Sequence, residues 1–195
     1  RQVYTGLCWV NARWVMIPMP WALLPDLCKE YEDDFQPAKD SPSLAHKGTA
    51  EGAKALLELF LKPDADLSAL TQALRPRKID VEAVWTEAAS AHYLKHYTNM
   101  FDMGIAIGAN AGQTEVLSYF LNTDDVIAWQ GEAANVLPGG YKQVKGWLKP
   151  GLPIVRFKFV KTGETLGMAF DGLYYVNERW VLMSNPWRNM PPEGK

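Results

Sequence analysis

The segment DGLYYVNERWVLMSNPW at residues 171–187 repeats, without a gap, the segment TGLCWVNARWVMIPMPW at residues 5–21. Nine of the 17 aligned positions are identical, and two of these are tryptophans. Self-similarity of this kind marks a repeated structural unit. The copies are offset by 166 residues, which predicts one complete unit over residues 22–187 and assigns residues 1–21 to the tail of a preceding copy.

Each copy predicts a β-hairpin. Short runs of apolar, aromatic and β-branched residues flank the dipeptide at 177–178 in the second copy and at 11–12 in the first. Both dipeptides begin with Asn, which tolerates the positive φ that two-residue hairpin turns require, although neither has the favoured Gly in second place. This register places Tyr175 opposite Trp180.

The chain before the second hairpin predicts helices first and strands afterwards. Helices are expected from an N-cap at Thr49 to Phe60, from Asp66 to Leu74, and from Asp80 along one long apolar stripe to Phe101. Strands are expected from Thr114 onward, and the last three form an antiparallel meander. The stripe of the third helix consists of Val81, Val84, Ala88, Ala91 and Leu94 and continues to Tyr97 and Phe101.

This order is typical of the α+β class, with N-terminal helices packed on a curved antiparallel sheet and an extra N-terminal β-hairpin. The domain prediction is a hairpin at 1–21, a polar linker at 22–49 and an α+β domain at 50–190.

Composition excludes several classes of protein. The chain has 195 residues, is 48% hydrophobic and 22% charged, and has a formal net charge of −2, which favours a soluble globular domain. No apolar run reaches the roughly 18 residues that span a bilayer, so no membrane insertion is expected. The largest basic cluster is Arg75, Arg77 and Lys78, too small for the charged surface that nucleic-acid binding needs.

The two cysteines leave the compartment open. Cys8 and Cys28 fit one disulfide in an exported protein or two buried thiols in a cytoplasmic one. Because Cys8 alternates with Trp9 in a strand pattern, the interpretation as buried thiols in the cytoplasm is favoured.

Several segments together resemble a family of uncharacterised bacterial proteins. They are LTQALRP (70–76), GQTEVL (112–117), LPGGY (137–141), RFKFV (156–160) and GMAFDGLYYVNERWVLMSNPWR (167–188). The chain departs from that family at Glu178, where Gly is usual, and at Ser184-Asn185, where Pro-Lys is usual. The resemblance implies no activity, and the repeat suggests tandem copies. The order of elements is also similar, more weakly, to the NTF2-like (cystatin-like) cone.

His92 and His96 form the sharpest local signal for chemistry. Their spacing of four residues places both imidazoles on one side of a helix, as in many metal sites, but the Glu of an HExxH motif is absent. Nothing in the sequence nominates a third ligand among Glu115, Asp171 and His46, so no metal or other cofactor is expected, and packing beside aromatic residues is favoured.

Asp171 is the best candidate for proton transfer, because a carboxylate near a pocket can act as general acid or base. Its counterpart in the first copy is Thr5, which can accept the same hydrogen bonds without transferring protons. This comparison favours a structural role for Asp171 at a bulge or turn. Arg179 and Trp180 recur in both copies and are predicted to be core residues.

The function predicted from these observations is a non-catalytic binding or interaction module. An apolar cleft between helices and sheet is expected to hold a small apolar ligand or a partner, and a homo-oligomer is expected through the N-terminal hairpin. The alternative is a small-molecule hydrolase or isomerase that uses His92, His96 or Asp171, with no catalytic residue assigned. The residues expected to line the cleft are Tyr119, Trp129, Phe157, Phe159, Phe170 and Tyr174.

Overall fold

The computed structural model describes residues 7–10, 13–16 and 35–191 of the chain. These fall into two compact units, Arg1–Phe35 and Gln36–Lys195. In the first unit, β1 (Leu7–Val10) pairs antiparallel with β2 (Arg13–Met16), and Trp9 lies opposite Trp14. The predicted turn at 11–12 and the predicted thiol of Cys28 lie outside the described residues.

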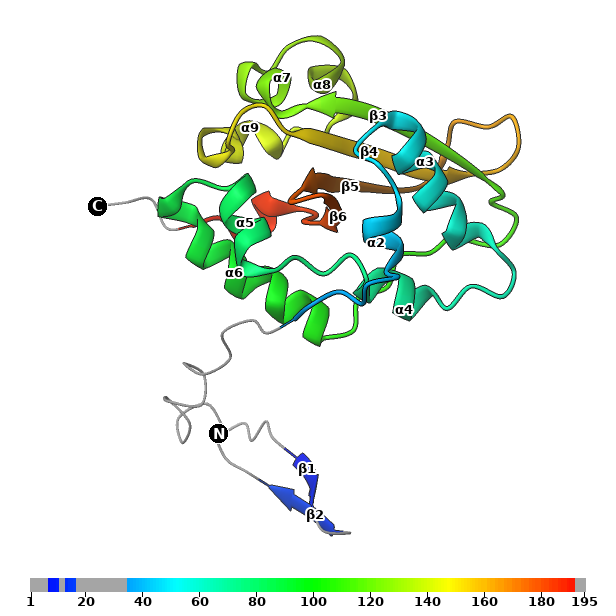
Figure 1. Ribbon diagram of the computed structural model, residues 1–195, viewed down its shortest axis with the longest axis vertical. Helices are drawn as coiled ribbons and strands as arrows, with labels where there is room; N and C mark the ends of the chain where they lie inside the picture. Colours follow the sequence, from blue (N-terminus) through cyan, green and yellow to red (C-terminus); the bar gives the residue numbers. More distant parts are fainter. Residues whose placement is uncertain (1–6, 11–12, 17–34, 192–195) are drawn as a thin grey trace, which may run out of the picture. The chain divides into compact units, whose positions relative to one another are not determined.

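The second unit is built on a four-stranded antiparallel sheet, as Figure 1 shows. The strands follow one another in space as in sequence, so the sheet is a simple meander. They are β3 (Glu115–Asn122), β4 (Pro153–Val160), β5 (Gly167–Val176) and β6 (Arg179–Leu182). Helices precede and interrupt this sheet, which confirms the α+β class.

The helices of the second unit are short, with one exception of 16 residues. Thr49 caps α3 as predicted, since its side chain accepts a hydrogen bond from Gly52 N, and Asp66 caps α4 in the same way through Ala69 N. No described helix is long and apolar enough to cross a membrane. The helices are α2 (Pro42–Ala45), α3 (Ala50–Glu58), η1 (Leu59–Leu61), α4 (Leu67–Gln72), α5 (Lys78–Val84), α6 (Glu87–Asp102), α7 (Thr123–Ala128), α8 (Gly131–Val136), α9 (Tyr141–Val144), η2 (Lys145–Trp147) and η3 (Pro186–Asn189).

The predicted single helix from Asp80 to Phe101 is wrong, because the chain leaves helical geometry at Trp85. Trp85 has an extended backbone and forms an isolated antiparallel bridge with Leu148. The next residue, Thr86, donates its N–H to Trp147 O at 2.8 Å. A tertiary contact with the η2 segment therefore divides the helix into α5 and α6.

This break also changes which face of α6 is buried. The predicted stripe included Ala88 and Ala91, and both are exposed. The buried residues are Ala89, Tyr93, Tyr97 and Phe101, which follow one another at intervals of four. The predicted stripe is therefore wrong at Ala88 and Ala91, next to the break at Trp85, but its continuation through Tyr97 and Phe101 is confirmed.

Two hydrophobic clusters pack on opposite faces of the sheet. Ile154 and Tyr174 face the cluster formed with α5, α6 and the segment from α7 to η2. Val155 and Leu173, their neighbours in sequence, face the cluster formed with α3, η1 and the end of α4. We call these the α6 face and the α3 face of the sheet. The two central strands, β4 and β5, are therefore covered on both sides.

A β-bulge in β5 breaks the alternation of side chains. The register with β4 shifts between Val155 and Phe157, so that Asp171 and Gly172 together lie opposite Arg156. Gly172 has φ of 73°, and a Cβ at this position would collide with the carbonyl oxygen of Met183. The bulge thus requires glycine, and it directs both flanking apolar residues, Phe170 and Leu173, to the α3 face.

The C-terminal hairpin has the predicted two-residue turn. Asn177 and Glu178 have φ of 49° and 60°, the left-handed pair that matches the twist of a hairpin. Tyr175 lies opposite Trp180 as expected, with ring centroids 5.1 Å apart.

Residues 36–49 of the segment predicted as a linker belong to the second compact unit. Helix α2 packs beside β6, and Ser43 is fully buried there. Trp180 Nε1 donates to Lys47 O at 3.2 Å, and Gly48 lies against the ring of Tyr175. The segment before α3 therefore covers the C-terminal hairpin.

Candidate functional site

The phenylalanines predicted to line a cleft form a packed group on the α3 face. The rings of Phe157, Phe159 and Phe170 lie 5.2 to 6.0 Å apart. Phe157 and Phe159 have no exposed surface. These side chains are part of the hydrophobic core of that face.

The other three aromatic candidates belong to the α6 face. Tyr174 is fully buried, with its ring 6.4 Å from that of Trp85. Tyr119 and Trp129 are half-buried at the edge of the same cluster, and Lys142 Nζ lies 5.2 Å from the Trp129 ring centroid. Because the sheet separates these residues from the phenylalanines, the six predicted residues do not line one cleft.

His92 and His96 are half-buried on α6 and pack beside aromatic rings. His92 lies against Tyr93 and shares a hydrogen bond of 3.1 Å with Asn189 O, while His96 lies against Tyr97. Burial lowers the pKa of His96, and the charge of His92 lowers it further. Among the residues that the structure describes, no group of three or more His, Cys, Asp and Glu side chains could hold a metal ion.

Asp171 lies at the bulge on the α6 face and is enclosed by hydrogen-bond donors. Its Oδ1 accepts from Tyr141 Oη at 2.9 Å and from Asn185 N at 3.2 Å, and its carbonyl accepts from Ser184 Oγ. Only 6% of the residue is exposed. Burial raises the pKa of the carboxyl, although Asn185, Tyr141 and the charges of Arg156 and Arg188 act against this.

Three buried tyrosines, Tyr97, Tyr141 and Tyr174, surround this carboxyl. Burial raises the pKa of each phenol, and the charge of Asp171 raises it further. The Tyr174 hydroxyl lies near that of Tyr141 but makes no hydrogen bond of good geometry to a described residue. The arrangement places a carboxyl with a raised pKa beside phenols with raised pKa values, in a site closed by packing.

Asp80 forms a second buried site with Arg179, at the other end of the C-terminal hairpin. Neither side chain is exposed, and Arg179 Nη1 donates to Asp80 Oδ2 at 2.7 Å. Arg77 adds two side-chain bonds and its backbone N–H to the same carboxylate, and Asn177 Nδ2 adds one of 2.8 Å. Burial alone would raise the pKa of Asp80, but these bonds and the charge of Arg179 lower it.

Arg179 also donates to the carbonyl oxygens of Ala73 and Arg75, at 2.8 and 3.0 Å. It thereby joins the LTQALRP segment to the C-terminal hairpin. The prediction that Arg179 and Trp180 are core residues is confirmed, since neither is exposed. The helix that was predicted to begin at Asp80 begins earlier, since Asp80 is the third residue of α5 and accepts from the N–H of the N-cap residue Arg77.

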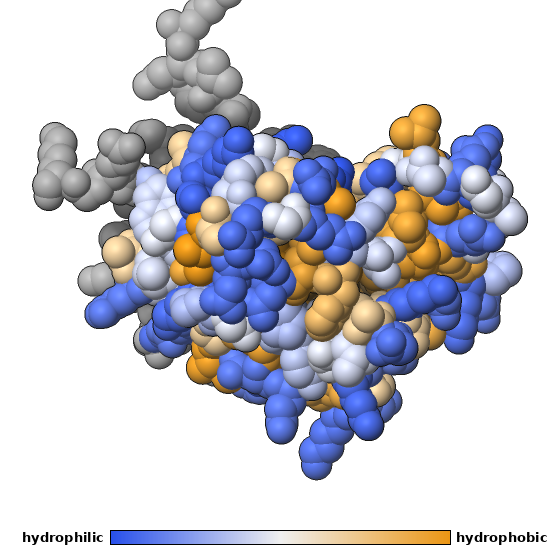
Figure 2. Space-filling model, turned by 90° about the horizontal axis from the view of Figure 1, so that it is seen from above, coloured by the Kyte–Doolittle hydropathy of each residue, from blue (hydrophilic) through white to orange (hydrophobic). Residues whose placement is uncertain are grey.

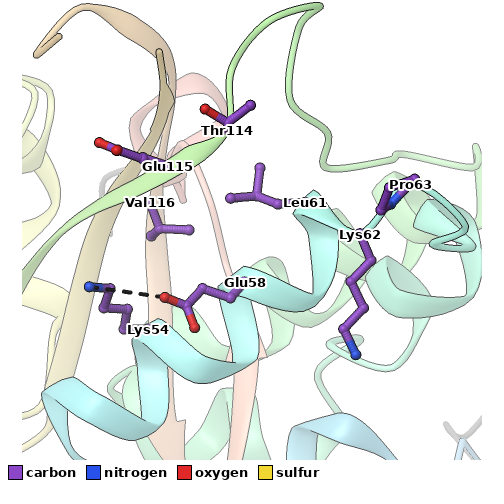
Figure 3. Close-up of a pocket in the computed structure, with 8 residues that line it drawn as sticks. All are labelled: Lys54, Glu58, Leu61, Lys62, Pro63, Thr114, Glu115 and Val116. Carbon is purple, nitrogen blue, oxygen red and sulfur yellow. Dashed lines mark ion pairs between the residues drawn. The ribbon is translucent and has the colours of Figure 1, made fainter. Parts of the chain in front are cut away.

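An open groove of about 530 Å³ lies between α3–η1 and the first residues of β3. In Figure 3, Val116 of β3 and Leu61 of η1 face each other across it. Lys54 and Glu58 of α3 form an ion pair of 4.0 Å at one side, and both side chains are more than half exposed. We call this site the α3–β3 groove, and its lining residues are Lys54, Glu58, Leu61, Lys62, Pro63, Thr114, Glu115 and Val116.

A smaller hollow of about 310 Å³ lies on the other side of η1. It lies between the start of α2 and the loop from η1 to α4, and Lys62 borders both sites. On the face seen in Figure 2, apolar side chains form separate groups between charged ones, without one continuous apolar patch.

The α3–β3 groove was not predicted from the sequence. Its residues belong to segments far apart in the chain, and none of them forms a motif with its neighbours. Comparison with protein-family models, with curated proteins and with solved structures gives no match.

Proposed function

We propose that this chain is a non-catalytic interaction module that binds an extended polypeptide segment in the α3–β3 groove. The observation that supports the proposal best is the combination of an open groove with an unpaired strand edge beside it. A helix next to an edge strand can hold a peptide that extends the sheet, with main-chain hydrogen bonds on one side and side-chain contacts on the other.

The edge of β3 offers these main-chain bonds. β3 is the first strand of the sheet, and among the strands that the structure describes it pairs with β4 alone. Thr123 N donates to Leu152 O, and these two residues continue the β3–β4 register, so the main chain of Thr123 faces β4. Along an antiparallel strand, residues that face the partner alternate with residues that face away from it. The N–H and C=O groups of Val116, Ser118 and Phe120 therefore point away from β4.

The sequence of β3 does not protect this edge. Edge strands usually carry charges, proline or a bulge that prevents pairing. Residues 116–121 (VLSYFL) contain neither charge nor proline, and the register with β4 runs without a shift. The opposite edge, β6, differs, because Leu182 N donates to Leu74 O at 2.9 Å.

The groove adds side-chain selectivity. Val116 and Leu61 provide apolar surface, while the exposed Lys54 and Glu58 provide one charge of each sign. We therefore expect a ligand with an apolar side chain at the groove and polar groups at its rim.

Selection of phage-displayed random dodecapeptides on the full-length protein tests the proposal. We expect selected peptides to bind the wild type and to lose binding to Leu61→Lys, whose side chain enters the groove. Met103→Lys is the matched control, because Met103 is 82% exposed and does not line the groove. Failure to select any peptide, or equal binding to both variants, would contradict the proposed function.

A small-molecule hydrolase or isomerase is the second candidate, and the carboxyl of Asp171 is the observation that favours it. Its raised pKa and its contact with Tyr141 are features of general acids. We expect Asp171→Asn to abolish any turnover found in a screen of ester and ketone substrates. Turnover that survives this substitution would remove the candidate.

We also propose, from the sequence, that the second unit shares the NTF2-like (cystatin-like) order and that β1 and β2 are the tail of a preceding tandem copy. The antiparallel sheet preceded by helices and the matching register of the two hairpins support these proposals. A small apolar ligand and association through the N-terminal hairpin remain predictions that light scattering and ligand-dependent melting temperature can test.

A further inference from the structure

Phe120 is an exposed aromatic residue on the same edge strand that borders the α3–β3 groove. It is 37% exposed, on a strand whose neighbouring positions are mostly half-buried. Phe120 lies opposite Val155 and Val116 lies opposite Phe159 in the β3–β4 register. Because Val155 and Phe159 both belong to the α3 face, Phe120 and Val116 lie on that face, four residues apart.

Two copies of β3 are complementary in one antiparallel register. Only residues with outward N–H and C=O groups can form the hydrogen-bonded pairs of a new ladder, and these are Val116, Ser118 and Phe120. A two-fold axis at Ser118 pairs Ser118 with its own copy and places Val116 opposite Phe120 of the second copy. Directly opposite residues on one face are close enough for their side chains to pack.

We propose that the occupant of the α3–β3 groove is the β3 strand of a second copy of this chain. Each copy then inserts Phe120 beside Val116 of the other, and the two four-stranded sheets join into one continuous sheet. The interface is isologous, so a single strand supplies both the exposed aromatic residue and the groove that receives it. This inference rests on the proposed function, because it names the partner of the same groove.

The absence of charge at the centre of β3 agrees with self-pairing. Residues 116–121 carry no charge, so the register brings no like charges together at its centre. The pairing also satisfies the outward N–H and C=O groups and removes Phe120 from water. A peptide from another protein would satisfy the same groups, but β3 itself already carries an exposed aromatic residue that this register places opposite Val116.

Sedimentation equilibrium of the full-length chain tests the inference, with two variants that act differently. Phe120→Glu places a charge in the proposed interface, at a position that is exposed in the single copy. Ser118→Pro removes an outward N–H, and proline is tolerated at such edge positions because the ladder to β4 is unaffected. Met103→Glu is the control for adding one negative charge in place of an exposed apolar residue.

We expect a dimer for the wild type and for Met103→Glu. For Phe120→Glu we expect the dissociation constant to rise about 100-fold or more, because two phenylalanines leave the interface. Ser118→Pro should sediment as a folded monomer, with the circular dichroism spectrum of the wild type. Hydrogen exchange at the amides of Val116, Ser118 and Phe120 should slow with protein concentration, while exchange at Leu117 and Tyr119 should be unchanged.

Three outcomes would overturn the inference: a wild type that is monomeric up to millimolar concentration, a dimer that persists in Phe120→Glu, or outward amides whose exchange does not depend on concentration. None of them contradicts the proposed function, which fails only if peptide selection on the groove fails. A dimer that persists in both variants would locate association elsewhere, for example at β1 and β2.

Discussion

Asp80 and Asp171 are both buried beside the C-terminal hairpin, yet the pKa of Asp80 is lowered and that of Asp171 is raised. Asp80 accepts hydrogen bonds from two arginines and an asparagine, whereas Asp171 accepts from one phenol and one backbone N–H. Burial alone therefore does not set the direction in which the pKa of a carboxyl shifts. At Asp80 the hydrogen bonds and the positive charge of Arg179 outweigh burial, whereas at Asp171 burial outweighs the hydrogen-bond donors.

Removing Arg179 should have the largest effect on the difference between Asp80 and Asp171. Arg179→Met leaves Asp80 buried with fewer cations and frees the carbonyls of Ala73 and Arg75, so we expect the free energy of unfolding to fall by about 3 to 5 kcal/mol. Urea unfolding measures this. Asp102→Asn is the control, because the Arg75–Asp102 pair is also 2.7 Å long but Asp102 is 55% exposed, and its loss should cost at most about 1 kcal/mol. Equal losses for the two variants would contradict the prediction.

The two carboxyls should give opposite pH dependence. Asp80 has a folded-state pKa below its ordinary value of 3.8, so its contribution to stability is complete above 3.8 and is lost as the pH falls through the folded-state pKa. Asp171 has a folded-state pKa above 3.8, so its contribution is complete below 3.8 and is lost as the pH rises through the folded-state pKa.

Unfolding curves of wild type, Asp80→Asn and Asp171→Asn at a series of pH values measure this difference. We expect the stability advantage of the wild type over Asp80→Asn to grow as the pH rises, and its advantage over Asp171→Asn to shrink. Parallel profiles for the two variants would show that the carboxyls are equivalent.

Tyr141→Phe tests the contribution of the hydrogen bonds to Asp171. The variant removes the phenol that donates to Asp171 Oδ1, and we expect a loss of about 1 to 2 kcal/mol because a buried acceptor loses a partner. Tyr119→Phe is the control, since its hydroxyl makes no hydrogen bond to a described residue, and it should change stability by less than about 0.5 kcal/mol. Thermal unfolding of both variants distinguishes these outcomes.

Glu178→Gly should have the smallest effect and the opposite sign. Glu178 is exposed with φ of 60°, a conformation that glycine adopts without strain. We expect a gain of about 0.5 to 1 kcal/mol. The substitution leaves Asn177 and its hydrogen bond to Asp80 in place. We therefore expect the same gain in stability whether Glu178→Gly is made in the wild type or in Asp80→Asn. A gain that disappears in Asp80→Asn would mean that the turn and the carboxylate are coupled.

Local signals predicted those parts of the fold that depend on neighbouring residues. Thr49 caps α3 through a bond three residues away, and Asn177 sets the turn of its own hairpin. Asp171 lies at a bulge, the position that its comparison with Thr5 had suggested, and its structural role stays a prediction. The break at Trp85 could not be predicted, since its cause is Leu148, which lies 63 residues away in the sequence.

The candidate site was less predictable for the same reason. The aromatic residues were chosen by type, but the bulge at 171–172 and the alternation of β4 decide which face each one occupies. The α3–β3 groove depends on how far α3 lies from β3. The residue types of Lys54, Leu61 and Val116 do not indicate that distance. The signal that could have suggested an unprotected sheet edge is the uncharged run VLSYFL at residues 116–121, which contains Ser118 and Phe120.

The bond between Asp80 and Arg179 has a consequence for how the chain is made. During synthesis from the N-terminus, Asp80 emerges from the ribosome long before Arg179, which follows 99 residues later. In that interval the carboxylate can pair with Arg77, three residues away. A nascent chain can therefore form α5 early with its charge paired, but it cannot close the C-terminal hairpin onto α5 until almost the whole domain has been translated.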